Sequence, residues 1–208
     1  MPESFINLTE GSGKKAHTFQ RVIGVNTVED TVAILGEQYL ASYNVPTAAA
    51  GTSAATAASH LLQIMAGGSL NVYVRAIRIY QLAVATVAAI DAIEIVRLTT
   101  AGTGGTAITP APRDASDAAS GATGMTLPTV KGTEGTFVDR ATGQWTQTIA
   151  TQSGGRQAVL VAEFVWDDLR SKSLRIPAGT TNGIAVKNPT ARAAATVIIA
   201  AYITEANF

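Results

Sequence analysis

The feature that most constrains the fold is a series of short apolar runs separated by turn residues. About ten segments rich in Val, Ile, Thr or aromatic residues are bounded by Gly, Pro, Asn, Asp or Ser, and no repeated helical pattern lies between them. Such spacing is typical of strands in two-layer antiparallel folds. The sequence therefore predicts an all-β protein, and at 208 residues the natural form is an antiparallel β-sandwich that is jelly-roll-like.

The clearest predicted strand covers residues 71–81, "NVYVRAIRIYQ". Apolar side chains alternate along it, but the alternation changes phase between Val74 and Ile77, which predicts a bulge or a twist near Ala76. Residues 53–65 are predicted as coil followed by a strand, and residues 31–35 fit either a strand or a helical turn. The pair Asn182-Gly183 predicts a tight turn. The other predicted strands are residues 19–25, 39–45, 93–98, 133–138, 145–149, 156–166, 173–176, 183–187 and 196–203.

The composition points to assembly. Charged residues make up 14% of the chain, against roughly 25% in an ordinary soluble domain. Because 47% of the residues are hydrophobic, we expect some surface to be hidden against other subunits. The 15 basic residues balance the 15 acidic ones, which argues against a nucleic-acid partner. Cysteine is absent, so disulfides, thiolate metal sites and a cysteine nucleophile are excluded.

The N-terminal segment differs from the rest of the chain. Residues 1–18 are polar and rich in turn formers, which predicts a flexible N-terminal arm followed by a single β-sandwich domain at residues 19–208. The start has neither a basic cluster nor an apolar core, so no secretory signal is expected. The longest apolar runs, residues 82–90 and 193–203, are shorter than the roughly 20 residues that span a bilayer. We expect synthesis in the cytoplasm and no membrane partner.

Residues 101–128 consist almost wholly of small and polar residues and predict a long loop. Its first part, "GTGGTA" from Gly102, has the spacing of a dinucleotide-binding turn, in which glycines let the backbone approach a pyrophosphate at a helix N-terminus. Pro110 and Pro112 follow too closely to allow that helix. We therefore predict no nucleotide site and expect this loop to lie against another protein.

Catalytic and metal-binding patterns are weak throughout the sequence. His17 and His60 lie in no zinc-binding spacing and are predicted as surface or interface residues. No G-x-S-x-G nucleophile elbow occurs. Asp167 and Asp168, with Glu163 nearby, lack the alternation of a calcium loop, so a solvated turn is favoured. The sequence predicts no enzyme activity, no cofactor and no metal ion.

Two further sets of side chains leave alternatives open. Trp145, Trp166 and Tyr73 fit either a carbohydrate-stacking surface or anchors in the core and at an interface. Arg75 and Arg78 differ by an odd number of positions on one strand, so they point to opposite faces unless the bulge intervenes. A single basic patch is therefore disfavoured.

Two stretches resemble structural proteins encoded by phages and prophages. In residues 71–128 a strand ends in "RLTTAGTGGTAITP" and is followed by a loop of Asp, Ala and Ser. In residues 173–205 the segment "LRIPAG" precedes "GIAVKN" and a last strand. The resemblance implies a virion role, such as a capsid decoration or cement protein, on a jelly-roll-like fold that is often trimeric. The N-terminal third carries no part of this pattern.

Residues and resemblance together predict a non-enzymatic virion structural protein that binds the phage capsid surface as a decoration or cement protein and stabilises the shell. The expected partners are further copies of the chain, with a trimer favoured, and the major capsid protein. The alternative is a receptor-binding or tail-associated adhesion module that recognises host surface glycans. The residues expected to contact partners are Lys14, Lys15, Thr103, Thr106, Pro110, Pro112, Arg113, Trp145 and Trp166.

Overall fold

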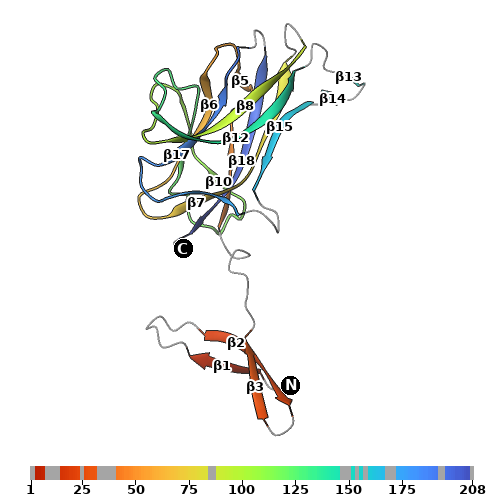
Figure 1. Cartoon of the computed structure of the whole chain (residues 1–208), viewed down its shortest axis with the longest axis vertical. Coiled ribbons are helices and arrows are strands. Elements are labelled where there is room, and N and C mark those ends of the chain that lie inside the picture. The colour runs from red at the N-terminus through yellow and green to blue at the C-terminus, as the bar shows by residue number, and fades with distance from the viewer. Residues whose placement is uncertain are drawn as a thin grey trace. The chain divides into compact units, whose positions relative to one another are not determined.

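The computed structural model describes residues 3–7, 15–23, 26–31, 41–83, 88–145, 151–152, 155–156, 159–166, 172–191 and 195–206. All regular structure in these residues is β, which confirms the predicted fold class (Figure 1). The chain divides into two compact units, Met1–Leu40 and Ala41–Phe208.

The N-terminal unit is a three-stranded antiparallel sheet in the order β1-β2-β3. Its strands are β1 (Glu3–Asn7), β2 (Lys15–Ile23) and β3 (Asn26–Thr31). Because β2 pairs with both neighbours, the boundary between the units follows Leu40 and not residue 18. The predicted arm at residues 1–18 thus contains β1 and the start of β2, and the rest of it lies outside the described residues.

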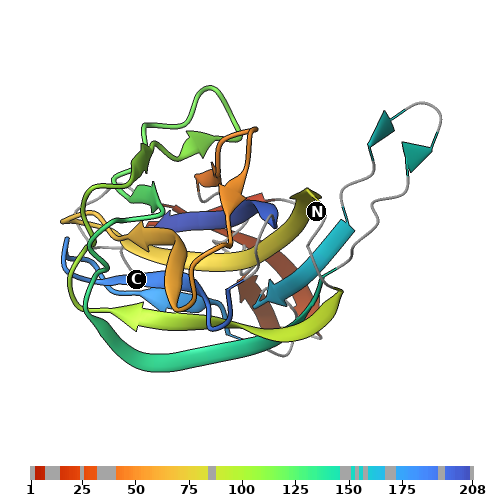
Figure 2. The ribbon, with the colours of Figure 1, turned by 90° about the horizontal axis from the view of Figure 1, so that it is seen from above.

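The larger unit is built from two antiparallel sheets packed face to face, which confirms the predicted β-sandwich. Figure 2 shows β7 and β18 in one layer and β8 and β12 in the other. The first sheet has the order β10-β4-β18-β7-β15, with β16 paired to β7 and β5 to β18; the second has the order β12-β8-β17-β6-β11-β9. The jelly-roll topology stays a prediction.

The strands of the first sheet are β4 (Ser42–Pro46), β5 (Thr52–Ser53), β7 (Asn71–Ala83), β10 (Ala111–Pro112), β15 (Val159–Val165), β16 (Leu174–Ile176) and β18 (Thr196–Ala206). The strands of the second are β6 (Ser59–Met65), β8 (Ala89–Leu98), β9 (Thr106–Ile108), β11 (Thr123–Thr126), β12 (Glu134–Trp145) and β17 (Gly183–Asn188). A separate hairpin pairs β13 (Thr151–Gln152) with β14 (Gly155–Arg156).

The core lies between the two sheets and is filled by alternate strand residues. On β18, Val197, Ile199 and Ile203 are at most 1% exposed, so these side chains belong to the core of the unit. Ile79 of the neighbouring strand β7 and Ile95 of β8 in the other sheet have no exposed surface either. Burying each isoleucine contributes about 1.5–3 kcal/mol, which makes this layer the main stabilising element.

The predicted bulge in β7 is confirmed by its pairing with β18. Tyr202 lies opposite Ala76, whereas the next residue, Ile203, lies opposite Val74, so Arg75 is the extra residue. The bulge moves the inward positions from Val74 to Ile77, both of which are buried. Residues 53–65 are coil followed by a strand, as expected, since β6 begins at Ser59.

The predicted tight turn at Asn182-Gly183 is wrong. The turn before β17 runs from Gly179 to Asn182, with the Asn182 amide donating to the Gly179 carbonyl at 2.9 Å. The residue with positive φ is Gly179, at 123°, because the preceding strand β16 pairs with β7 in the other sheet and no tight hairpin is formed. The strand expected at residues 133–138 lies within the longer strand β12, whose described part reaches Trp145; of the strand expected at residues 145–149, residues 146–149 lie outside the described residues.

Residues 101–128 do not run as one long loop, because they contain the short strands β9, β10 and β11. Small side chains such as Gly124 let β11 pair with β6 on one side and β9 on the other. Glu205 is 6% exposed and accepts hydrogen bonds from Ser120 Oγ at 2.7 Å and the Ala122 amide at 2.8 Å. Much of this stretch is therefore fixed to its own domain.

Candidate interaction surface

The outer side of the seven-stranded sheet carries rows of apolar and aromatic side chains, and we call this surface the tyrosine face. Residues directly opposite each other in an antiparallel pair project to the same side of the sheet. The register therefore places three rows on this side: Leu160, Tyr80 and Ile198; Glu163, Arg78, Ala200 and Pro46; and Val165, Ala76, Tyr202 and Asn44.

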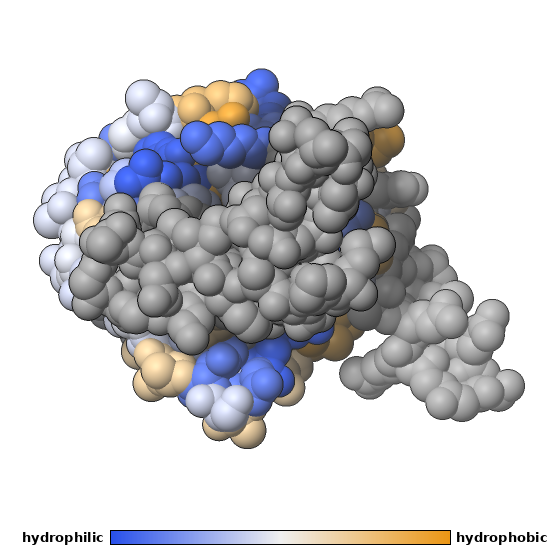
Figure 3. All heavy atoms as spheres, turned by 90° about the horizontal axis from the view of Figure 1, so that it is seen from below, coloured by the Kyte–Doolittle hydropathy of each residue, from blue (hydrophilic) through white to orange (hydrophobic). Residues whose placement is uncertain are grey.

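Several members of the tyrosine face retain exposed apolar surface. Leu160 is 45% exposed and Val165 is 51% exposed, both on β15 at one edge of the sheet. Tyr80, Ile198 and Tyr202 are half-buried. Figure 3 shows one side of the molecule, where hydrophobic and hydrophilic residues lie beside one another among the described atoms.

Tyr202 lies between two guanidinium groups. The Arg78 guanidinium is 5.8 Å from the centre of the Tyr202 ring, and that of Arg113 is 5.7 Å away, both within range of a cation–π contact. Arg78 also donates to Glu163 Oε1 at 2.6 Å, and this carboxylate raises the pKa of Arg78. Within the described part of the chain, Arg113 forms no ion pair. Tyrosine and arginine are both enriched at the centres of protein interfaces.

Arg75 and Arg78, together with Arg97, do not form one basic patch. Arg75 lies at the bulge and donates to Ser173 Oγ at 2.7 Å, whereas Arg78 bonds to Glu163. Arg97 belongs to β8 in the other sheet. The disfavoured basic patch is thus not formed by these side chains.

The residues that were expected to contact partners differ in how exposed they are. Thr103, Thr106, Pro112 and Arg113 are exposed, whereas Pro110 and Trp145 are buried and Trp166 is half-buried. The backbone of Lys15 is in β2, and Lys14 lies outside the described residues, as do Asp167 and Asp168 of the calcium hypothesis. Arg113 adjoins the tyrosine face through its contact with Tyr202.

The tryptophans do not form a shared exposed platform. Trp145 is 2% exposed and belongs to the hydrophobic core. Trp166 stacks on the buried ring of Phe164, with centroids 5.8 Å apart and an angle of 13° between the planes. Tyr73 is 7% exposed. Trp145 and Tyr73 are therefore buried, as the interpretation of these residues as core anchors predicted. Neither ring is available to stack on a sugar.

The glycine motif after β8 has a structural role. The Gly102 amide donates to Gln63 Oε1 at 2.9 Å, and the Thr103 amide donates to the Val130 carbonyl at 2.9 Å. A phosphate loop needs such amides to point at its ligand. Here these two amides bind protein acceptors, in agreement with the sequence-based rejection of a nucleotide site.

A buried polar network lies beneath this motif, and it corrects the prediction that His60 is a surface residue. His60 has no exposed surface and lies on β6. Its Nε2 donates to Glu134 Oε1 at 3.0 Å, and its Nδ1 accepts from Gln63 Nε2 at 2.7 Å. Lys187 Nζ donates to Glu134 Oε2 at 2.8 Å. The network joins β6, β12 and β17 and fixes Gly102 above them.

The charges of this network are set by burial and by each other. Burial lowers the pKa of His60, and the nearby Glu134 opposes this effect only in part. Burial alone would raise the pKa of Glu134, but its bonds with Lys187 and His60 outweigh burial and lower it. A neutral imidazole and an ionised carboxylate satisfy every bond named above. The network therefore stabilises the packing of β6, β12 and β17 against one another.

We expect this network to make stability depend on pH. The pKa of His60 is lowered from 6.5 in the folded chain, so its contribution is complete above pH 6.5 and is lost as the pH falls toward the folded pKa. The lowered pKa of Glu134 removes further stability as the pH falls below 4.5. Thermal unfolding followed at pH 7.5 and pH 5.0 should show a smaller loss of Tm in His60→Gln than in the native chain. Equal losses would contradict this role of His60.

Within the described ranges, no group of three or more His, Asp or Glu side chains is arranged to hold a metal ion. In the same part of the chain, none of the regular structure is a helix that could cross a bilayer.

The fold and these surfaces place the chain among all-β sandwich proteins. No protein-family model matches its sequence, and no curated protein or solved structure matches it.

Sequence reasoning missed Tyr202 and the His60 network. A signal for Tyr202 was present, because strict alternation from Val197 to Ile203 places Tyr202 on the opposite side of β18 from the core. No local signal joins His60 to Glu134, which are 74 positions apart.

Proposed function

We propose that the chain is a non-enzymatic virion structural protein that binds the phage capsid surface as a homo-oligomer and stabilises the shell as a decoration or cement protein. The observation that carries the proposal is the tyrosine face, where apolar and aromatic side chains remain partly exposed across four strands. Exposed apolar and aromatic side chains that surround a charged pair, here Arg78 and Glu163, are typical of sites of protein association.

The tyrosine face supplies the contacts between copies of the chain. Leu160 and Val165 contribute apolar area, and Tyr202 with Arg113 adds side chains that suit the centre of an interface. The low charge content of 14% also favours burial of surface in an assembly. A specific interface needs about 1,000 Å² or more of buried area, which a sheet face of four strands can supply.

The exposed residues of the 101–128 stretch supply the contacts with the capsid protein. Thr103, Thr106 and Pro112 are exposed while the stretch that carries them is held to the domain by Glu205 and Gln63. An ordered segment loses less conformational entropy on binding than a free loop. Several copies joined in one oligomer multiply a weak contact by avidity.

Association through the tyrosine face is tested by Val165→Glu. The new carboxylate on the half-exposed edge of this face should convert the oligomer to monomer, or weaken association about 10-fold or more, without unfolding the chain. Native mass spectrometry and sedimentation velocity measure the change. Phe137→Glu is the matched control, because Phe137 is 55% exposed on β12 of the other sheet. An oligomer that is equally stable in both variants would overturn the assignment of this face.

A further inference from the structure

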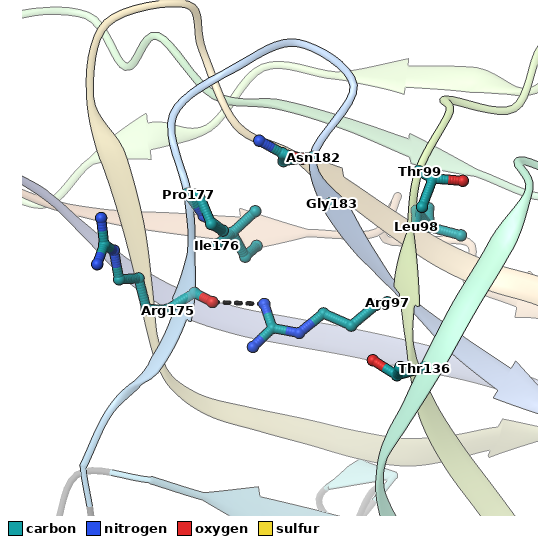
Figure 4. Close-up of a pocket in the computed structure, with 9 residues that line it drawn as sticks. All are labelled: Arg97, Leu98, Thr99, Thr136, Arg175, Ile176, Pro177, Asn182 and Gly183. Carbon is teal, nitrogen blue, oxygen red and sulfur yellow. Dashed lines mark hydrogen bonds between the residues drawn. The ribbon is translucent and has the colours of Figure 1, made fainter.

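A pocket of about 450 Å³ opens where the ends of strands from both sheets come together. It is lined by the end of β8, by Thr136 of β12, by the segment from Arg175 to Pro177 and by Asn182 before β17 (Figure 4). Its volume lies within the range of small-molecule sites. Both sheets contribute to it, so its shape depends on the packing of the sandwich.

Arg97 is the charged group inside this pocket. Figure 4 shows its side chain reaching from β8 toward β16, where Nη1 donates to the main-chain carbonyl of Arg175. A guanidinium carries five N–H donors. Within the described part of the chain this is the one hydrogen bond that the Arg97 guanidinium makes, and no carboxylate pairs with it there. The side chain of Arg175 points away from the pocket and donates to Asn71 Oδ1 at 3.1 Å.

The environment of Arg97 favours an anion. The side chain is half-buried, and burial lowers the pKa of Arg97 because the charged form loses solvation. Arginine still remains protonated in proteins, so the site holds a partly desolvated positive charge. Such a charge is costly unless an opposite charge or several acceptors approach it.

The shape of the site favours a carboxylate attached to a small apolar group. The planar fork of a guanidinium matches the two oxygens of a carboxylate. The exposed Pro177 forms an apolar wall beside Arg97, and the exposed Thr136 adds a hydroxyl on the other side (Figure 4). A ligand can therefore place its carboxylate against Arg97 while its apolar part contacts this wall.

We propose that the pocket binds a carboxylate group, with Arg97 as the anchoring residue. The carboxylate belongs either to a small organic acid or to an acidic side chain on a protein segment, and the same contacts recognise both. This inference is independent of the proposed virion role, since it depends on the pocket alone.

Binding is tested by NMR titration of the full chain with butyrate, its neutral isostere butyramide, and a short blocked peptide with one Asp beside a Leu. We expect butyrate or the peptide to shift the Arg97 Nε–H signal and the Thr136 methyl signal, and butyramide to leave them unchanged. Tighter binding of the peptide identifies a protein ligand, and tighter binding of butyrate identifies a small acid. Equal shifts with butyrate and butyramide, or none with any probe, would overturn the proposal.

Two variants establish the role of Arg97. Arg97→Gln should weaken binding about 10-fold or more, because a charge-assisted pair is lost. Arg97→Lys keeps the charge without the planar fork and should bind with intermediate strength, which also covers the case in which Arg97→Gln fails to fold. Arg140→Gln is the control, since Arg140 is an exposed arginine paired with Glu94 at 2.6 Å on another surface. Undiminished binding by Arg97→Lys and Arg97→Gln would contradict the assignment.

Discussion

Replacing Gly105 with alanine should lower the free energy of unfolding of the larger unit by about 3 kcal/mol. A Cβ at this position would lie 2.3 Å from the Thr126 carbonyl oxygen, 2.8 Å from Met125 Cγ and 2.9 Å from the Pro128 amide nitrogen. Two of these three atoms are backbone, so a change of rotamer cannot remove the overlap. The backbone before β9 must move away from residues 125–128 at the end of β11 to admit the methyl group.

Urea unfolding followed by tryptophan fluorescence measures this effect, since the buried Trp145 reports on the core. Gly68→Ala is the matched control, because no heavy atom lies within 4 Å of a Cβ built there. We expect the control to change the free energy of unfolding by no more than about 0.5 kcal/mol. If Gly105→Ala is as stable as Gly68→Ala, the close packing of the glycine motif is refuted.

Replacing Glu134 with alanine should destabilise the chain by about 2–3 kcal/mol. The change removes both acceptors of the polar network, so the buried His60 Nε2–H and the Lys187 ammonium lose their partner. The Lys187 side chain is 18% exposed and that of Glu134 is 28% exposed, so water recovers part of the loss. The magnitude is therefore below that of a fully buried ion pair.

Lys131→Ala gives the contrast within the same cluster. Lys131 Nζ is 3.8 Å from Glu134 Oε1 and its side chain is 45% exposed, so this pair should contribute less than about 1 kcal/mol. Denaturant unfolding of both variants at pH 7.5 measures the two values. Equal losses of unfolding free energy in Glu134→Ala and Lys131→Ala would show that the bonds of Glu134 to His60 and Lys187 do not stabilise the chain more than the exposed pair does.

The sequence pattern predicted the parts of the fold that depend on alternation along one strand. The bulge in β7 was visible because the apolar phase changes between Val74 and Ile77. The core positions of β18 follow from the same period, since Val197 and Ile199 project inward together. These features need no knowledge of which strands become neighbours.

The features that sequence reasoning missed depend on contacts between distant residues. The turn at Asn182-Gly183 was misassigned because the strand before it pairs with the other sheet. His60 has a polar side chain that suits the surface, yet Gln63 and Glu134 satisfy both its ring nitrogens in the interior. Pairing across sheets and burial of a satisfied polar group are tertiary effects that one strand does not encode.

The same limit applies to the interaction surface. Arg113 was singled out as a partner contact from its place in a polar stretch, but its position over Tyr202 arises from the pairing of β10 with β4 and of β4 with β18. Trp145 was singled out for its aromatic ring, and it is held in the core at the end of β12. Exposure distinguishes the two residues, and exposure is a property of the folded chain.

We propose that this chain is an assembly protein of a phage capsid. Sedimentation of the purified chain, alone and with capsids of the encoding phage that lack it, tests the claim most directly. We expect a homo-oligomer, with a trimer favoured, that co-sediments with the capsids and raises the temperature at which they disassemble. A chain that stays monomeric and does not bind the capsids would contradict it.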